Sequence, residues 1–294
     1  MKTLIAMALL GSALAAAPET GYVAEVERAR EARANGLSTP DGWLSLVALE
    51  WLKPGDTTVG SGASEKVHLE HAPAHLLTLH VDTSGTVSLV DSAAGTTVGG
   101  QPASAGPLPD GERGGSIRQG NLILSVIERG QGGERRKYLR IKDAYAPTRT
   151  HFHGLNWYPI EPKLHVVAKW TPTPGKTLTI PNVLGQVSQE ESPGVAEFVL
   201  NGQTLRLAPI QEDKRSLFFI FRDTTSRTTT YGAGRFLTTP LPSNGLSSPG
   251  TVEMDFNLAV NPPCGYTPYA TCPLPPEQNR LAAAIEGGEK RYHD

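Results

Sequence analysis

The sequence is poor in cysteine and in net charge. It has two cysteines, and its 27 lysine and arginine residues nearly balance 29 aspartate and glutamate residues, which gives a formal net charge of −2. A chain so close to neutral has no broad positive field for nucleic acid or anionic lipid, so we expect neither as a partner. Beyond its first residues it also lacks an apolar run long enough to span a membrane.

Most motifs that name a reaction are absent. The sequence has no glycine-rich phosphate loop with a lysine, no dinucleotide-binding fingerprint that opens a βαβ unit, and no Gly-x-Ser-x-Gly nucleophile elbow. The best candidate metal ligands are His151 and His153, which would share one face of an extended segment. No third ligand is evident near them in the sequence. We therefore expect no bound metal and no cofactor, and the sequence alone names no reaction.

The first 17 residues, MKTLIAMALLGSALAAA, have the pattern of a Sec signal peptide. Lys2 precedes an apolar core at Leu4–Leu10, and small residues follow it. We predict that residues 1–17 are removed near Pro18 and that the mature protein is exported, to the periplasm or the exterior. The alternative is an apolar N-terminal helix of the mature fold.

Residues 18–56 begin the mature chain. Glu19–Asn35 is highly charged with a narrow apolar stripe, and this pattern predicts a short helix with a solvated face. Trp43–Leu52 (WLSLVALEWL) is dense in apolar residues, so we expect a buried element there, either a helix or a strand.

Residues 57–142 have the pattern of a β-sandwich, because short apolar runs alternate with turns rich in glycine, proline, aspartate and serine. Three pieces also resemble forkhead-associated domains: Thr58–Ser61, Val87–Asp91 and Gly95–Gly100. In that family an arginine, a serine and an asparagine hold phosphothreonine, whereas Ser61, Pro73 and Ala94 stand at those places here. The resemblance therefore implies the fold and not the ligand, since a bidentate phosphate contact needs the arginine.

Residues 143–294 predict a second antiparallel β domain, a barrel or a sandwich, because successive strand patterns are joined by short loops. Asn201-Gly202 between two apolar runs predicts a two-residue hairpin turn. Asn279–Ile285 has a short helical pattern, closed by Gly287-Gly288. The predicted fold class is therefore all-β, with two antiparallel domains and short helices at the N- and C-termini.

The best candidate site lies in the C-terminal domain. At Val252–Asn257 one strand face is apolar and the other is polar. Arginine offers a fork for a carboxylate or phosphate, aspartate a general base, and tyrosine and asparagine orienting hydrogen bonds. The candidate ligand-binding residues are Arg222, Tyr231, Arg235, Asp255, Asn257 and Asn261. The alternative is a solvent-facing strand whose polar residues bind nothing.

Cys264 and Cys272 lie in a proline-rich segment with seven residues between them. Export favours oxidation, and Gly265 and Pro268 favour a turn that brings the two ends together, so we predict a disulfide. A metal site would need further ligands, and a reactive thiol would need a nearby cation to depress its pKa.

Several C-terminal motifs resemble one bacterial family. The motifs are TYGAGRFL at 230–237, DFN at 255–257, NPPC at 261–264, CPLPP at 272–276 and NRL at 279–281. They are similar to the family catalogued as domain of unknown function 1684, and Trp43–Gly62 and Gly154–Pro159 fit it too. The resemblance spans nearly all of the mature chain, and it implies no activity and no catalytic residue.

Three hypotheses of function follow. The first is a binding or envelope accessory protein that holds a small polar or anionic ligand near the candidate residues. The second is a hydrolase in which Asp255 is the general base and Tyr231 or Arg235 stabilises charge. The third is a structural envelope protein in which the C-terminal motif is a packed plug.

Overall fold

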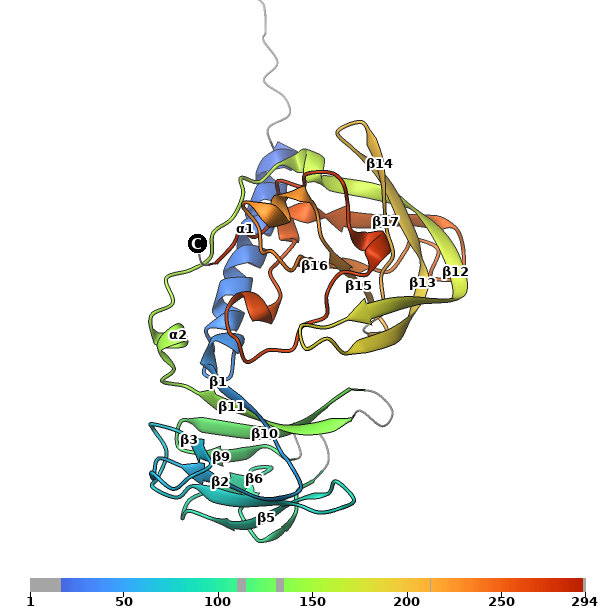
Figure 1. The fold of residues 1–294 in the computed structure, drawn as a ribbon. Helices are drawn as coiled ribbons and strands as arrows, with labels where there is room; N and C mark the ends of the chain where they lie inside the picture. The colour runs from blue at the N-terminus through green and yellow to red at the C-terminus, as the bar shows by residue number, and fades with distance from the viewer. Residues whose placement is uncertain (1–16, 110–114, 131–134, 212, 293–294) are drawn as a thin grey trace, which may run out of the picture.

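The computed structural model describes residues 17–109, 115–130, 135–211 and 213–292. The predicted signal peptide, apart from Ala17, lies outside the described residues. Two β domains are stacked in Figure 1, and helix α1 (Ala17–Leu37) lies along the upper one. The predicted helix at Glu19–Asn35 is confirmed as part of α1. No helix among the described residues is both long and apolar enough to cross a membrane.

The lower domain in Figure 1 is a sandwich of two sheets, as the sequence predicted. One sheet has the strand order β1-β11-β10-β9-β6-β7 and the other β3-β2-β4-β5-β8. Buried leucines, valines and isoleucines from both sheets form one core between them. The strands are β1 (Leu46–Trp51), β2 (Gly55–Gly60), β3 (Val67–His68), β4 (Leu77–Val81), β5 (Val87–Ser92), β6 (Thr97–Val98), β7 (Gln101–Pro102), β8 (Gly106–Pro107), β9 (Ile117–Gln119), β10 (Leu122–Arg129) and β11 (Arg136–Asp143).

The upper domain has two antiparallel layers. A four-stranded sheet, β14-β13-β12-β17, faces the two-stranded sheet β15-β16. Trp170 and Phe198 of the first layer and Phe219 and Phe221 of the second share one buried core. The strands are β12 (His165–Pro181), β13 (Val187–Leu200), β14 (Gln203–Leu207), β15 (Ser216–Phe221), β16 (Arg235–Pro240) and β17 (Gly250–Asp255).

A local turn signal predicted one hairpin of this domain. β13 and β14 are joined by Asn201-Gly202, with Leu200 opposite Gln203. Asn201 has φ 50° and Gly202 φ 76°, the left-handed pair that a two-residue hairpin turn requires. The predicted hairpin is therefore confirmed in both its position and its turn chemistry.

Two apolar segments differ in detail from the sequence expectation. Trp43–Leu52, predicted as a helix or a strand, begins with a 3-10 turn at Trp43–Ser45 and continues as β1. The helix predicted at Asn279–Ile285 is replaced by a 3-10 turn at Glu277–Asn279 followed by irregular chain. Here the backbone pairs with the end of β15 rather than with itself: Leu281 N donates to Arg222 O at 2.7 Å.

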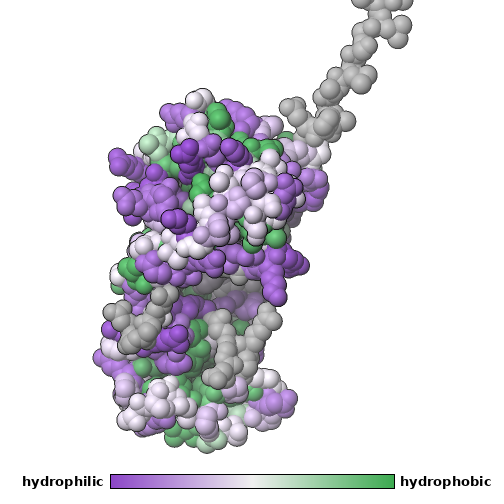
Figure 2. Space-filling view, turned by 90° about the vertical axis from the view of Figure 1, so that its right-hand side faces the viewer, coloured by the Kyte–Doolittle hydropathy of each residue, from purple (hydrophilic) through white to green (hydrophobic). Residues whose placement is uncertain are grey.

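The two domains are joined by a small cluster and by a few polar contacts. Leu37, Leu44 and Tyr266 form a buried apolar group between the end of α1, the start of the lower domain and the C-terminal loop. The side chain of Arg129 in β10 donates to Thr271 Oγ1 at 2.8 Å. Figure 2 shows the surface hollowed between the domains on this side, in agreement with a pocket of about 280 Å³ that residues of both domains line.

Three histidines of the sandwich contact carboxylates: His71, His75 and His80. His75 lies between two of them, with Nε2 2.8 Å from Asp91 Oδ1 and Nδ1 3.0 Å from Glu65 Oε1. Asp91 and then Glu65 raise the pKa of His75 above its ordinary 6.5, and His75 in turn lowers the pKa values of Glu65 and Asp91 below 4.5 and 3.8. The charge attraction between His75 and the two acids is therefore greatest when the histidine is protonated and both acids are ionised.

We expect this trio to give the sandwich its greatest stability between about pH 4.5 and 6.5. The histidine contribution is complete below the unfolded pKa of 6.5 and is lost as pH rises through the higher folded value. The acid contributions are complete above 4.5 and are lost as pH falls through the lowered folded values. Melting temperature against pH should be flatter for His75→Gln than for wild type. An identical profile for His75→Gln would contradict the assignment.

Candidate functional site

The structure divides the six predicted site residues among separate groups of contacts. Asp255 and Asn257 belong to one hydrogen-bonded network, Asn261 to a second and Arg235 to a third. Tyr231 contacts the cysteine loop, and Arg222 pairs through its backbone with the C-terminal segment. The segments do meet in one domain, but their side chains have separate partners.

The Asp255 network attaches helix α1 to the upper domain. Tyr22 OH of α1 donates to Asp255 Oδ2 at 2.9 Å, and Asn257 Nδ2 donates to Asp255 Oδ1 at 2.9 Å. The same amide group contacts Glu161 O at 2.9 Å, and Asn257 is fully buried. Burial and the neighbouring Asp255 raise the pKa of Tyr22, so its hydroxyl keeps its proton and donates. At its C-terminal end the polar face of this strand thus contacts helix α1 through Asp255, whereas Glu253 on the same face is exposed.

Arg30 adds a second attachment of α1 at the same place. Its guanidinium donates to Tyr158 O at 3.0 Å and to Asn257 O at 3.2 Å, and it stacks over the ring of Trp157 at 4.7 Å. An arginine can do both because its plane stacks while its edge donates. Helix α1 therefore binds the backbone of the Asp-Phe-Asn motif as well as its side chains.

Arg235 is buried inside the upper domain, with 1% of its surface exposed. Its Nη2 donates to Asp223 Oδ2 at 2.6 Å and to Ile285 O at 2.9 Å, and its Nη1 donates to Gly287 O. Asp223 is equally buried and also accepts from Thr225 N at 2.8 Å. Burial lowers the pKa of Arg235, and the adjacent Asp223 opposes this effect. This arginine is the centre of a structural ion pair that holds the C-terminal segment.

Asn261 lies in a network around the buried carboxylate of Glu289. Asn261 Nδ2 donates to Glu289 Oε1 at 2.8 Å, and Asn261 N donates to Oε2 at 3.1 Å. Tyr266 OH also donates to Glu289, and Arg33 Nε of α1 lies 3.9 Å from it. Burial raises the pKa of Glu289 and that of Tyr266. Helix α1 thus meets the C-terminal segment at three levels, through Tyr22, Arg30 and Arg33.

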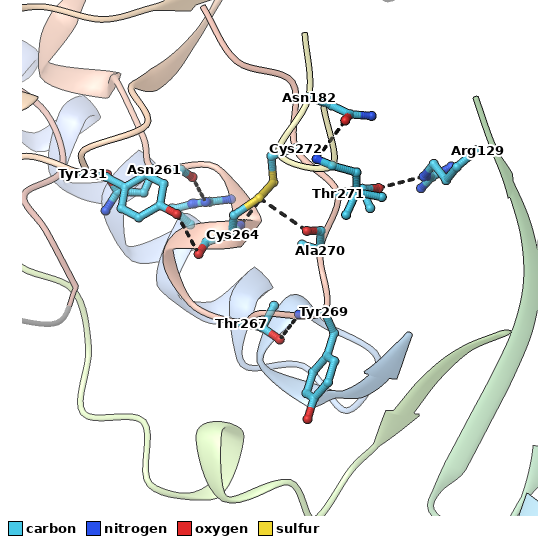
Figure 3. The surroundings of a disulfide bond; sticks show 12 residues. Arg129, Asn182, Tyr231, Asn261, Cys264, Thr267, Tyr269, Ala270, Thr271 and Cys272 are labelled. Atoms are coloured by element: carbon cyan, nitrogen blue, oxygen red, sulfur yellow. Dashed lines mark hydrogen bonds between the residues drawn. A yellow bond between two sulfur atoms is a disulfide. The ribbon is translucent and has the colours of Figure 1, made fainter. Parts of the chain in front are cut away.

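The cysteine loop is closed by a disulfide, as the sequence predicted, and Figure 3 shows its surroundings. Cys264 and Cys272 are bonded with their Cα atoms 6.2 Å apart. Tyr231 OH donates to Cys264 O at 3.0 Å, and Arg129 reaches Thr271 from the lower domain. Burial raises the pKa of Tyr231, which remains a donor. The loop is thereby held by contacts on both of its sides.

Reduction of the disulfide should loosen residues 260–276 without unfolding either sheet. Closing so short a loop stabilises by roughly 2–3 kcal/mol in the chain-entropy model. We expect the bonds of Tyr231 and Arg129 to the loop to remain, because neither involves a sulfur atom. Hydrogen exchange should therefore rise in this segment only, and the double variant Cys264→Ser, Cys272→Ser should match the reduced protein. Two free thiols in the denatured, unreduced chain would contradict the pairing.

A pocket of about 230 Å³ opens beside Asp255, between α1 and the strands β12, β16 and β17. The ring of His165 stacks on Tyr22 with 5.5 Å between centroids, and its Nε2 lies 3.8 Å from Glu253 Oε2. The lining residues are Tyr22, Glu25, Val26, His165, Thr238, Pro240, Glu253, Asp255 and Leu258. Of the six predicted site residues, Asp255 is the one in this lining.

Sequence reasoning missed Tyr22, Asp223 and Glu289 as partners of the predicted residues. In the sequence, Tyr22 contributes only to the apolar stripe of the predicted helix. Nothing in the sequence indicates that its hydroxyl will bind a carboxylate, or which one. Asp223 follows an apolar strand after one residue, Arg222, and Glu289 follows a glycine pair. A carboxylate can be buried at either position. Position in the chain was therefore the only signal, and it was a weak one.

The comparisons with known proteins agree with the motif resemblance. Residues 150–290 match the family described as protein of unknown function (DUF1684), which confirms the motif resemblance over that part of the chain. A solution NMR structure of an uncharacterized protein from Haloarcula marismortui is similar, with 30% identity and a TM-score of 0.41, and the match covers 48% of this chain and 78% of that one. No functionally curated protein matches the chain.

Proposed function

We propose that the chain is an exported protein that binds a small polar ligand in the pocket beside Asp255. The observation that carries the proposal is a carboxylate held in place by Tyr22 and Asn257 at the wall of that pocket. Ligand sites usually combine an apolar surface with a few polar groups whose positions are fixed, and Val26, Pro240 and Leu258 supply the apolar part here. A volume of about 230 Å³ is below the range of drug-sized sites, which favours a small molecule.

The charges of the lining favour a ligand that carries an amine or several hydroxyl donors. Glu25, Glu253 and Asp255 face a single histidine, His165. Carboxylates accept hydrogen bonds and attract ammonium groups, so an anion would be repelled. The arginine forks that supported an anionic ligand, Arg222 and Arg235, are not among the lining residues. We therefore narrow the ligand to a small cationic or polyhydroxylated compound.

The test is a thermal shift series on the mature chain with ethanolamine, putrescine, glucosamine and glucose against acetate and phosphate. A ligand that binds the native state raises the melting temperature by mass action. We expect at least one amine or sugar to do so and both anions to fail. Glu253→Gln should reduce the shift, since this exposed carboxylate lines the pocket and takes no part in the Tyr22 network.

Glu286→Gln is the matched control, because Glu286 is an exposed glutamate away from the pocket. It should leave the shift unchanged. Absence of any shift at millimolar concentrations, or equal shifts in Glu253→Gln and wild type, would overturn the proposal.

A structural role for the C-terminal motif is the second candidate function. It is favoured by the network contacts, since Asn257, Asn261 and Arg235 all bond inside the protein. The hydrolase hypothesis is less well supported. It needs Tyr231 or Arg235 to stabilise charge beside Asp255, and both side chains bond to other groups. If no ligand binds and Tyr22→Phe releases α1, the motif serves only to attach the helix.

Export is part of the proposal. The N-terminal sequence has the signal-peptide pattern, and a disulfide persists in oxidising compartments outside the cytoplasm. Intact-mass measurement of the secreted protein should place the N-terminus near Pro18. A species from the envelope that retains Met1 would contradict export by this route.

A further inference from the structure

The upper domain has a further pocket, at the place where β12 and β13 lose their regular pairing. It has a volume of about 400 Å³, which is within the range of small-molecule sites. It lies between these two strands, the chain after β14 and the loop before β17. The lining residues are Pro172, Pro174, Glu190, Glu191, Pro193, Ile210, Gln211, Leu246 and Ser247.

The pocket follows from a bulge in the hairpin. The pairing shifts between Pro172 and Lys176 of β12, where β13 has only Pro193 between the corresponding partners. Pro174 also lies in this interval, and a proline has no amide hydrogen to donate to a sheet. Gly175 supplies the left-handed backbone of the bulge, with φ 72°. Bulges of this kind redirect side chains and are frequent beside functional sites.

The walls of the pocket are held by hydrogen bonds from the interior. Trp170 is fully buried, and its Nε1 donates to Leu246 O at 3.1 Å. Ser192 Oγ donates to Pro209 O at 2.8 Å, and Ile210 exchanges two backbone bonds with β15. These bonds fix the loop before β17 and the chain after β14 against the hairpin. A ligand would therefore enter a cavity that is already formed, which lowers the entropic cost of binding.

Glu190 is the carboxylate that faces the pocket. Side chains alternate along β13, so Glu190 points to the same face as Ser192. It is opposite Leu178, which is buried in a cluster against which Ile210 packs. Glu190 is half-buried, whereas the next residue, Glu191, is exposed. A charge beside an apolar wall is less screened by water than a charge in open solvent, so it attracts a cation more strongly.

The lining combines an apolar surface with negative charge. Its apolar part consists of three prolines, Ile210 and Leu246, and its charged residues are Glu190 and Glu191. No lysine, arginine or histidine occurs among the described residues that line it. An apolar surface favours an apolar body, and a carboxylate accepts charge-assisted hydrogen bonds from an ammonium group. We propose that this pocket binds a small amine with a compact apolar body, such as a single aromatic ring, whose ammonium group pairs with Glu190.

This site goes beyond the proposed function, because it shares no lining residue with the pocket beside Asp255. The pocket beside Asp255 has a smaller volume, about 230 Å³, and favours a small cationic or polyhydroxylated compound. The larger pocket and its apolar lining favour a ligand that carries a ring. The two sites therefore differ in ligand and are tested separately.

The test is calorimetric titration of the mature chain with phenethylamine, which has an aromatic ring and an ammonium group. Ethylamine lacks the ring and phenylacetate carries the opposite charge, so both should bind at least about tenfold more weakly. Raising the ionic strength from about 0.1 to 1 M should weaken phenethylamine binding, as the Debye length falls from about 10 to 3 Å. In the wild type, the amide NMR signals of Glu190, Ile210 and Leu246 should shift during the titration, because these residues line the pocket.

Glu190→Gln keeps the size of the side chain and removes its charge, so it should weaken phenethylamine binding about tenfold. Glu197→Gln is the control, since Glu197 lies on the same strand outside the lining. It should bind phenethylamine as wild type does, and so should Glu253→Gln, which alters the pocket beside Asp255. The NMR shifts of the wild type test the location even if a variant does not fold.

The proposal is overturned if phenethylamine binds more weakly than about 1 mM, or if ethylamine or phenylacetate binds as tightly as phenethylamine. It is also overturned if Glu190→Gln binds as wild type does, or if Glu197→Gln loses as much affinity. NMR shifts at Tyr22 and Asp255 instead, with a loss of binding in Glu253→Gln, would overturn it and support the pocket beside Asp255 alone.

Discussion

Replacing Asp223 with alanine is expected to lower the free energy of unfolding by about 3–5 kcal/mol. The change leaves Arg235 charged and buried, with its Nη2 without the carboxylate that lies 2.6 Å away in the native protein. It also removes the acceptor of Thr225 N, which caps the turn after β15. Domains are stable by only about 5–15 kcal/mol, so this loss is a large fraction of the stability of the upper domain.

The size of this effect depends on burial. Asp223 and Arg235 have side-chain exposures of 0% and 1%, so water cannot replace the missing partner. Surface ion pairs, such as the one between Glu197 and Arg206, contribute about 0–1 kcal/mol by comparison. Replacing both buried partners by apolar residues should cost less than replacing either one alone, because no uncompensated charge remains.

Chemical denaturation of four proteins checks this expectation: wild type, Asp223→Ala, Arg235→Ala and the double variant. The matched control is Arg227→Ala, an exposed arginine in the turn between β15 and β16, which should change stability by less than about 0.5 kcal/mol. Losses that simply add in the double variant would show that the two side chains do not act as a pair. A loss below about 1 kcal/mol for Asp223→Ala would mean that water reaches the site.

The sequence hypothesis places Arg235 and Asp255 in one ligand-binding pocket, which would put the carboxylate of Asp255 near the arginine. The partner is instead Asp223, twelve residues before it, and the two meet because β15 and β16 pair with Phe221 opposite Arg235. Strand alternation placed Arg222 and Asp223 on opposite faces, and their burial agrees: Asp223 is buried and Arg222 is partly exposed. The alternation of side chains along a strand does not predict which of its two faces is buried at the end of the strand.

Features that depend on neighbouring residues were predicted reliably from the sequence. The Asn-Gly turn, the alternating strands, the first helix and the disulfide all depend on residues close together in the chain, and all are present. Asn279 shows why the rest was missed. Its side chain bonds to Ala208 N and O and to Ile220 O, 59 to 71 residues away. These contacts satisfy buried groups that a helix would have left unpaired, so tertiary structure overrides a helical pattern there.

The candidate site was partly predictable for the same reason. The motif residues were chosen as polar side chains in backbone-restricted segments, and all six have partners or neighbours in the upper domain. The partners from α1 could not be predicted, since Tyr22 and Arg33 lie more than 220 residues from Asp255 and Asn261 in the chain. The periodicity of α1 predicts one apolar stripe that packs against the protein. It does not predict which polar residues beside the stripe become buried with it.

Replacing Glu289 with alanine is the second change with a large expected effect. The side chain is fully buried and accepts from Asn261 N, Asn261 Nδ2 and Tyr266 OH. Asn261 Nδ2 also donates to Lys290 O at 2.8 Å, so the stranded donors are Asn261 N and Tyr266 OH. Stranding two buried donors at about 1–3 kcal/mol each predicts a loss of roughly 2–6 kcal/mol. Because Arg33 of α1 lies 3.9 Å from the same carboxylate, the C-terminal half of α1 should also exchange its amide hydrogens faster.

The titration of Glu289 gives this prediction a pH signature. Burial raises its folded pKa above 4.5, so the folded state binds the proton more tightly than the unfolded state does. The contribution of the protonated form is complete below pH 4.5 and is lost as pH rises through the folded value. Glu289→Gln, which keeps the shape and cannot ionise, should lack this decline with rising pH.

Glu286→Ala is the control for both measurements, because Glu286 is exposed three residues earlier in the same segment. It should leave stability within about 0.5 kcal/mol of wild type and leave exchange in α1 unchanged. If Glu289→Ala is equally mild, the carboxylate does not hold α1, and the helix must be attached through Tyr22 and Arg30 alone. If it instead releases α1 while the sheets stay protected, helix docking is a separate cooperative step, and Glu289 is the residue that couples it to the C-terminal segment.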